Sequence, residues 1–265
     1  NSTTTPSIFN FGGGRLLANG ATTLASTFMQ GLTAATVYPG GAVLDVSNAN
    51  ITVNQALLAP TGSGVASIPV AYGGVGYIGA PVVLISGGSG TGATAIATVD
   101  LETNSATFGQ VTGITVTSPG SGYLPTDFLS VTLFRGGYTT MAQAGAPILA
   151  ANTATGGLTK LGTGVLTLGG VNTYGGSTVI SNGTLRLGNA SALSPDSEIV
   201  LAGGTLDLNG FTITNSLSVI SGVVSNGNLR TVISPAGEGS VGAETVVLKS
   251  ATLQGSYIAD VTTDG

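Results

Sequence analysis

The sequence contains no cysteine, no histidine and no tryptophan, and charged residues make up only 6% of its 265 positions. Without cysteine there are no disulfides, and without cysteine or histidine the usual zinc sites cannot be built. Catalytic triads that rely on histidine are excluded for the same reason. These absences argue against an enzyme that uses nucleophilic or zinc chemistry, and we expect no metal site and no cofactor.

Positive charge is also scarce, with 6 lysines and arginines against 11 acidic residues and a formal net charge of −5. A basic surface that could neutralise phosphates is not predicted, so we expect no nucleic-acid partner. The mean hydropathy is high, at +0.46. The apolar residues nevertheless alternate with Thr, Ser and Gly, and no run approaches the roughly 18 apolar residues of a membrane-spanning helix. We therefore expect no membrane insertion by this segment.

Glycine is abundant, at 44 of 265 residues, and Val, Leu, Thr and Ser fill much of the remainder. β-Branched residues favour extended backbone, and glycine tolerates the positive-φ turns that separate short strands. Residues that favour helices, such as Glu, Lys, Arg and Gln, are few. The composition therefore predicts an all-β protein.

Short leucine-containing segments repeat along the chain. Three of them, spaced by 19 and 21 residues, are GVLTLGG at 164–170, GTLRLGN at 183–189 and GTLDLNG at 204–210. Another copy, GGRLLANG at 13–20, matches GGTLDLNG at 203–210 in five of eight positions. VLDVSNANIT at 43–52 resembles TLDLNGFTIT at 205–214. The two ends of the chain are thus predicted to share one repeating unit.

A repeat of about 20 residues is typical of one coil of a β-solenoid, in which strands stack about 4.8 Å apart. Because the leucines of Leu-Xaa-Leu point to one face of a strand, we predict two interior columns made of Leu166, Leu168, Leu185, Leu187, Leu206 and Leu208. The middle residue of each Leu-Xaa-Leu segment points outward. Arg186 is therefore predicted to lie above Asp207 and to form an exposed ion pair across two coils. Tight corners, or alternatively hairpin turns, are predicted at the Asn-Gly pairs 19–20, 182–183, 209–210 and 226–227.

A different repeat occupies the middle of the chain. GVGYIGAPVVLISGG at 74–88 is echoed by GSGYLPTDFLSVTLFRGG at 120–137, and their Gly-Tyr pairs are 46 residues apart. Each copy continues through a proline into an alternating apolar run that ends in Gly-Gly. We predict a compact two-repeat β module at 62–145, inserted between N-terminal solenoid coils at 1–61 and C-terminal coils at 146–265.

Residues 155–193 carry a longer motif, in which GGLTK precedes Gly-Xaa-Gly-Xaa-Leu-Xaa-Leu, then NTYGG at 172–176 and NGTL at 182–185. This segment resembles the autotransporter-associated β-strand repeat, also called the passenger-associated transport repeat. The resemblance implies a right-handed parallel β-helix exported to the bacterial cell surface, associated with adhesion, aggregation or fibre formation, and it supplies no catalytic residues. The central Gly-Tyr repeat is similar to modules of bacterial surface and phage structural proteins.

Few carboxylates stand at a spacing that suits metal binding or acid–base catalysis. Asp100 and Glu102, and likewise Asp196 and Glu198, stand two residues apart. Either pair suits calcium binding or acid–base catalysis, as in polysaccharide lyases and glycosidases of this shape. Both pairs lie in polar stretches typical of turns, and we interpret them as turn residues.

Two further sets of residues are candidates for special roles. Lys160 and Lys249 are candidates for a Lys–Asn crosslink, which requires a buried lysine, an asparagine and an acid together. Tyr72, Tyr77 and Tyr123 are candidates for an exposed platform that binds glycan. The alternative interpretation is that these tyrosines pack inside their own module.

Together these observations predict a secreted bacterial surface protein, a right-handed parallel β-helix with an inserted β module. Its predicted role is structural, as a subunit of an extracellular fibre or surface layer that polymerises head-to-tail with copies of itself, because uncapped solenoid ends invite stacking. An alternative is an adhesin or receptor-binding module whose inserted domain recognises cell-surface glycan. A β-helix enzyme that degrades polysaccharide is a further alternative, although we expect no enzymatic activity.

Overall fold

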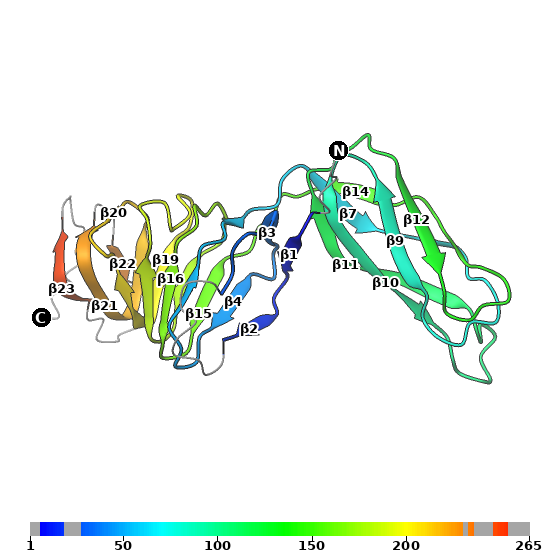
Figure 1. Ribbon diagram of the computed structural model, residues 1–265, viewed down its shortest axis with the longest axis horizontal. Coiled ribbons are helices and arrows are strands. Elements are labelled where there is room, and N and C mark those ends of the chain that lie inside the picture. The colour runs from blue at the N-terminus through cyan, green and yellow to red at the C-terminus, as the bar shows by residue number, and fades with distance from the viewer. Residues whose placement is uncertain (1–5, 19–27, 230–232, 236–245, 254–265) are drawn as a thin grey trace, which may run out of the picture. The chain divides into compact units, whose positions relative to one another are not determined.

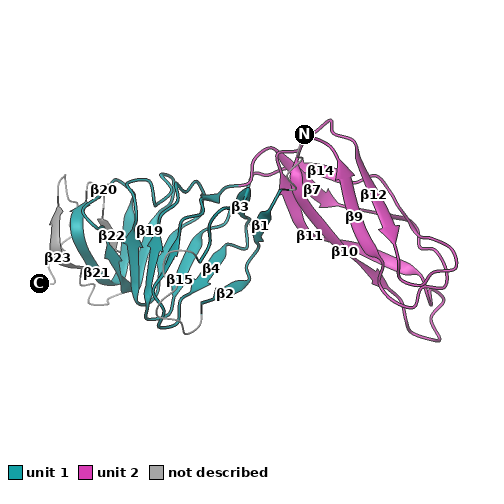
Figure 2. Ribbon diagram, in the orientation of Figure 1, with its two compact units in different colours: residues 1–59, 154–265 teal, residues 60–153 magenta. Residues whose placement is uncertain are grey.

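The computed structural model describes residues 6–18, 28–229, 233–235 and 246–253. These residues form strands and loops without a helix, so the predicted all-β class is confirmed, and none of them belongs to a helix that could span a membrane. The chain divides into two compact units, coloured separately in Figure 2. Unit 1 comprises residues 1–59 and 154–265, and unit 2 comprises residues 60–153.

Unit 1 consists of short parallel strands stacked coil upon coil, as Figure 1 shows. β15 pairs with β17 and not with β16, its neighbour in sequence, so pairing skips to the next coil. This pattern is that of a β-helix, as predicted. Its strands are β1 (Ile8–Phe11), β2 (Arg15–Leu17), β3 (Ala34–Val37), β4 (Ala42–Asp45), β5 (Ile51–Val53), β6 (Leu57–Leu58), β15 (Leu158–Leu161), β16 (Val165–Leu168), β17 (Thr178–Ile180), β18 (Thr184–Leu187), β19 (Ile199–Asp207), β20 (Thr212–Ile213), β21 (Leu217–Leu229), β22 (Ile233–Pro235) and β23 (Val246–Leu253).

The strands of unit 1 line up on three faces. The first face runs through β2, β4, β15, β17 and the beginning of β19. The second runs through β5, β16, β18 and the end of β19. The third begins with β1, β3 and β6. Alternate side chains on these strands point inward, so VLTL of β16 has every second residue buried. One apolar core therefore fills the inside of the coils.

Corners between the faces use backbone conformations that few residues adopt. Asn209 and Gly210 have φ of 49° and 85°, Asn226 has φ of 56°, and Gly183 has φ of 64°. The pairs 182–183 and 209–210 connect strands that pair in parallel with neighbouring coils, and the pair 226–227 lies within β21, so none of the three is a hairpin turn. The Asn-Gly pair at 19–20 lies outside the described residues.

Unit 2 interrupts the chain between β6 and β15 without interrupting the stack of coils. β4 lies directly beside β15, with Leu44 opposite Lys160. β5 lies directly beside β16, with Ile51 opposite Leu166. The two parts of unit 1 therefore share continuous sheets, although 94 residues, from 60 to 153, separate them in sequence.

Unit 2 consists of antiparallel strand pairs. β10 pairs with β11, β9 with β12, β8 with β13 and β7 with β14. Its smaller apolar core includes Tyr77, Val111 and Leu133. The strands are β7 (Ser63–Ser67), β8 (Val70–Tyr72), β9 (Val82–Gly87), β10 (Thr91–Val99), β11 (Val111–Ser121), β12 (Leu129–Phe134), β13 (Gln143–Ala144) and β14 (Ile148–Ala151).

The boundaries of unit 2 differ from the predicted range 62–145. The prediction that residues 146–153 continue the solenoid is wrong, because β14 pairs with β7 and belongs to unit 2. The segment ILAA of β14 is a short apolar run without alternation, so it fits either sheet. Its place was decided by the strand it pairs with, which local sequence does not specify.

Candidate functional site

The six leucines of the predicted interior columns lie inside the coils, and none has any solvent exposure. Leu166 lies opposite Leu185, and Leu185 lies opposite Leu206. Leu168 likewise lies opposite Leu187, and Leu208 completes the set. Identical side chains at identical positions pack against one another from coil to coil, so the columns hold the stack in register.

The ion pair across two coils is formed by Arg186 and Asp207, with Nε and Oδ2 2.7 Å apart. Asp207 Oδ1 also accepts hydrogen bonds from the backbone N–H of Asn209 and from Asn226 Nδ2. Burial acts to raise the pKa of Asp207, and these bonds together with Arg186 more than compensate, so the pKa lies below its ordinary value. Because Arg186 is 46% exposed, the pair contributes at most about 1 kcal/mol.

A second arginine–aspartate pair joins neighbouring coils near the other end of unit 1. Arg15 on β2 contacts Asp45 at the end of β4. Asp45 Oδ1 accepts a bond from the N–H of Ser47, whose φ is 48°, just as Asp207 binds Asn209, whose φ is 49°. The resemblance between residues 43–52 and 205–214 thus reflects the same corner built twice.

Lys160, in the GGLTK motif, is completely buried. Its Nζ donates hydrogen bonds to three main-chain oxygens, those of Leu161 at 3.1 Å, Gly162 at 2.6 Å and Asn182 at 2.9 Å. The ammonium group therefore joins two successive coils at a corner. A Cβ on Gly183 would lie 2.7 Å from Nζ, so only glycine leaves room for it. The suggested Lys–Asn crosslink of Lys160 stays a prediction; the side chain of Lys249, on β23, lies outside the description.

Burial lowers the pKa of Lys160 from 10.5 to about 8, and the charge of Asp45 acts in the opposite direction. Between those two pH values the folded chain has released this proton while the unfolded chain keeps it, so the free energy of unfolding should rise with pH. We expect Lys160→Met to remove this rise, and Arg186→Met to keep it. Urea unfolding at several pH values from 8 towards 10.5 measures the difference. Equal pH dependence in wild type and Lys160→Met would contradict the assignment.

The NTYGG motif places a second set of buried polar groups in the core. The hydroxyl of Tyr174, which is fully buried, lies 2.7 Å from Thr178 Oγ1, and Thr178 Oγ1 lies 2.7 Å from Ser197 Oγ in the next coil. Asn172 accepts a bond from the N–H of Leu57 and donates one to the oxygen of Ala192. Asn172 thus satisfies backbone groups of both adjacent coils, and the hydroxyls of Tyr174, Thr178 and Ser197 satisfy one another in the core.

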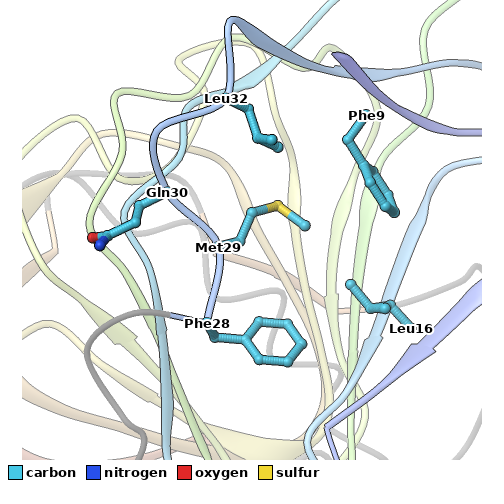
Figure 3. A pocket seen from close by; sticks show the side chains of 6 residues that line it. All are labelled: Phe9, Leu16, Phe28, Met29, Gln30 and Leu32. Carbon is cyan, nitrogen blue, oxygen red and sulfur yellow. The ribbon is translucent and has the colours of Figure 1, made fainter. Parts of the chain in front are cut away.

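The strongest candidate for an interaction site is an apolar cavity at the N-terminal coil, drawn in Figure 3 and here called the N-terminal cavity. Its volume is about 320 Å³, and its walls come from β1, β2 and the segment 28–32. In Figure 3 the apolar side chains converge on the cavity, whereas Gln30 points away from them. The lining residues are Phe9, Leu16, Phe28, Met29, Gln30 and Leu32. The apolar ones among them face the inside of the first described coil.

Sequence reasoning did not single out these lining residues. Phe9 and Leu16 occupy alternating positions in strands next to a Gly-Gly-Gly corner, and that pattern alone predicts inward-facing side chains. It does not predict that Phe9 remains 37% exposed and lines a cavity of the first described coil. Only the order of the coils reveals that.

The tyrosines proposed as a glycan-binding platform do not share one surface. Tyr77 and Tyr123 are buried, with 2% and 4% exposure, so the prediction of an exposed platform is wrong for both. The hydroxyl of Tyr77 accepts a hydrogen bond from the N–H of Ala142, and its ring lies 5.4 Å from that of Tyr138. These contacts make it a packing residue. Tyr72 is 46% exposed, and its role in binding stays a prediction.

The carboxylate pairs lie in loops. Asp100 accepts hydrogen bonds from Ser105 Oγ, Thr107 Oγ1 and the N–H of Glu102, and these bonds lower its pKa. Asp100 therefore organises the loop between β10 and β11. Among the residues that the structure describes, no three Asp, Glu, His or Cys residues are grouped as a metal site requires.

Asp196 and Glu198 lie in the connection before β19, and both are exposed. The residue between them, Ser197, points inward instead and joins the buried hydroxyl pair with Thr178. The two acids thus share the solvent face of one coil.

Comparison with known proteins identifies one part of unit 1. The family model of the passenger-associated-transport-repeat matches residues 158–187, which span β15, β16, β17 and β18. No curated protein and no solved structure matches the chain. The matched segment contains the buried Lys160, the NTYGG motif and four of the six column leucines. Residues 158–187 therefore match the passenger-associated transport repeat, and a repeat of this kind implies a secreted or cell-surface protein.

Proposed function

We propose that this chain is a non-enzymatic structural subunit that stacks end to end with copies of itself into an extracellular fibre or surface layer. The passenger-associated transport repeat supports a surface location. The observation that carries the self-stacking role is the N-terminal cavity, whose apolar walls belong to the first described coil of the β-helix. Such a surface is suited to the coil of another β-helix.

The strand edges beside the cavity have the geometry that stacking requires. Among the described residues, β1 pairs with β3 and β2 pairs with β4, and neither pairs with a second strand. A coil added here would continue the parallel hydrogen-bond pattern at a spacing of about 4.8 Å and cover the apolar side chains. A second copy of this chain is the occupant we favour, because a stack needs parallel strands with the same corner positions.

Similarity between coils supports a second copy as the partner. The segment GGRLLANG of the first described coil matches GGTLDLNG at 203–210 in five of eight positions, and the strand β19 of that segment stacks between β18 and β21. Low charge density also favours association, since only 6% of residues are charged and little repulsion opposes contact between copies.

End-to-end stacking is tested by a substitution that introduces a charge into the N-terminal cavity. We expect the wild-type chain to form fibres or end-to-end oligomers at high concentration, and Phe9→Glu to stay monomeric, because a carboxylate in that apolar contact would be desolvated. Ile78→Glu is the matched control, since Ile78 is 80% exposed in unit 2. Electron microscopy and light scattering report the outcome. A wild-type chain that stays monomeric at high concentration contradicts the proposal.

A second candidate function is binding of cell-surface glycan by unit 2. It is favoured by large side chains open to solvent there, since Phe128 is 94% exposed and Tyr72 is 46% exposed. Exposed aromatic rings suit the apolar faces of sugars. We expect Phe128→Ala with Tyr72→Ala to abolish binding on a glycan array if this role is correct. Unchanged binding by the double variant would exclude these residues as the site.

A further inference from the structure

Unit 2 is divided into two halves that depend on each other. The first half covers residues 60–99, the second covers residues 111–153, and the loop 100–110 connects them. All residues from 60 to 153 are described, and every strand pair among them joins one half to the other: β7 with β14, β8 with β13, β9 with β12 and β10 with β11. The isolated bridges Ser63–Tyr123 and Val75–Thr140 also cross between the halves. Neither half contains a strand pair of its own.

The two halves have the same backbone design. The glycines at equivalent positions share left-handed conformations. The φ values are 69° and 74° for Gly74 and Gly120, 79° and 81° for Gly76 and Gly122, 90° and 88° for Gly87 and Gly136, and 72° and 76° for Gly88 and Gly137. Glycine is the residue that adopts φ in this range at little cost. Four matched positions in succession show that the sequence repeat is a structural repeat.

Contacts between the halves are also equivalent in the two directions. Val75 pairs with Thr140, and Ser121 pairs with Thr91. Further along, Gln143 pairs with Tyr72 and Ala144 with Val70, while Thr94 pairs with Ser118 and Ala95 with Val116. A register shift follows Gln143 in the first case and Thr94 in the second. The first half therefore contacts the second as the second contacts the first.

The buried tyrosines show this reciprocity at the level of side chains. Tyr77 of the first half receives a hydrogen bond from the N–H of Ala142 in the second half, at 2.9 Å. Tyr123 of the second half has a hydrogen bond with the backbone of Ala93 in the first half. Each half thus contributes a buried tyrosine that hydrogen-bonds to the backbone of the other half.

We propose that the halves of unit 2 exchange between two chains, so that the partner of unit 2 is a second copy of this chain. In an exchanged pair, the first half of one chain pairs with the second half of the other, and every strand pair and tyrosine contact is kept. The loop 100–110 changes conformation, and so do the connections to unit 1 at 59–62 and 152–154, because both ends of unit 2 lead into the same β-helix. The hydrogen bonds of Asp100 to Ser105 and Thr107 favour the closed loop of the single chain, so they oppose exchange.

This proposal does not rest on end-to-end stacking. Exchange joins two chains through unit 2, whereas stacking joins them through the N-terminal cavity of unit 1. In a fibre, exchange would crosslink neighbouring β-helices. The variant Phe9→Glu, which is expected to prevent stacking, therefore serves as the background for testing exchange separately.

The absence of cysteine from the sequence makes a disulfide test possible. Ser86 on β9 and Ser130 on β12 lie directly opposite each other and are both exposed. Opposed residues of antiparallel strands have Cα atoms about 4.5–5.5 Å apart, which suits a disulfide. In one chain, Ser86→Cys with Ser130→Cys should form an internal disulfide.

The decisive sample mixes two full-length chains, one carrying only Ser86→Cys and the other only Ser130→Cys. After unfolding, joint refolding at high concentration and oxidation, we expect at least tenfold more covalent dimer than in either chain alone. Exchange alone places the thiol at position 86 of one chain opposite the thiol at position 130 of another. If the double variant closes its internal disulfide while the mixture gives no excess dimer, the proposal is wrong.

A second variant tests the same idea without cysteines. Deleting residues 100–110 joins Val99 directly to Val111, the residue it pairs with, so that β10 cannot turn back onto β11 within one chain. We expect this full-length variant to be a dimer by light scattering, with backbone amides of β10 and β11 protected from hydrogen exchange. A monomer with the same protection would overturn the proposal, and so would loss of protection in β10 and β11.

Discussion

Leu185→Ala is expected to lower the free energy of unfolding of the β-helix by about 3–5 kcal/mol. The side chain has no solvent exposure and lies between Leu166 and Leu206 in the neighbouring coils. Its removal leaves a cavity that the surrounding coils can only partly fill, because strand pairing on both sides holds the backbone in place. The cost is the lost burial of the isobutyl group together with the lost contacts to both neighbours.

Hydrogen exchange and urea unfolding measure this effect. Because each coil of a solenoid contacts only its neighbours, protection should fall most in β16, β18 and the end of β19. Val171→Ala is the matched control, since Val171 is 60% exposed and its truncation should change stability by less than about 0.5 kcal/mol. A loss below about 1 kcal/mol for Leu185→Ala would mean that the leucine columns do not hold the stack together.

Gly120→Ala is expected to destabilise unit 2 by at least about 2 kcal/mol. Gly120 has φ of 74°, and a Cβ there would lie 2.7 Å from the nitrogen of Ala93 and 2.8 Å from the ring of Tyr123. These neighbours are backbone and a buried ring, so they cannot move aside cheaply. Gly74 has the equivalent surroundings in the first half, with Thr140, Ala142 and Tyr77 as its neighbours.

A glycine in the same strand provides the control for this prediction. Gly113 on β11 has no atom within 4 Å of an added Cβ. We expect Gly113→Ala to leave stability unchanged or slightly raised, because alanine restricts the unfolded chain. Hydrogen exchange of peptides from residues 60–153 measures unit 2 without interference from unit 1. Equal protection in the two variants would show that the glycines at the tyrosines are not required.

Much of unit 1 was predictable from local pattern. The spacing of 19 and 21 residues between Leu-Xaa-Leu segments places Leu166, Leu185 and Leu206 in one column, and the structure pairs these residues directly. The same register brings Arg186 to Asp207. Such features follow from a repeat because each coil meets a near copy of itself, so equivalent residues must be neighbours.

Other features depended on which segments meet across long distances in sequence. Tyr77 and Tyr123 look alike in sequence whether they pack inside or face solvent, and their burial is decided by contacts with residues of the opposite half. β14 was assigned to the wrong unit because its partner, β7, lies more than 80 residues earlier. Alternation identifies a strand but not the strand beside it.

The sequence by itself determined the all-β class, the coil length, the interior columns and the passenger-associated transport repeat, because all of these are periodic and periodicity is visible in one chain. Tertiary structure decided the rest. It placed Lys160 among three carbonyl oxygens, formed the N-terminal cavity at the first described coil and paired each half of unit 2 only with the other. These outcomes depend on how distant segments desolvate and hydrogen-bond one another, which no local pattern records.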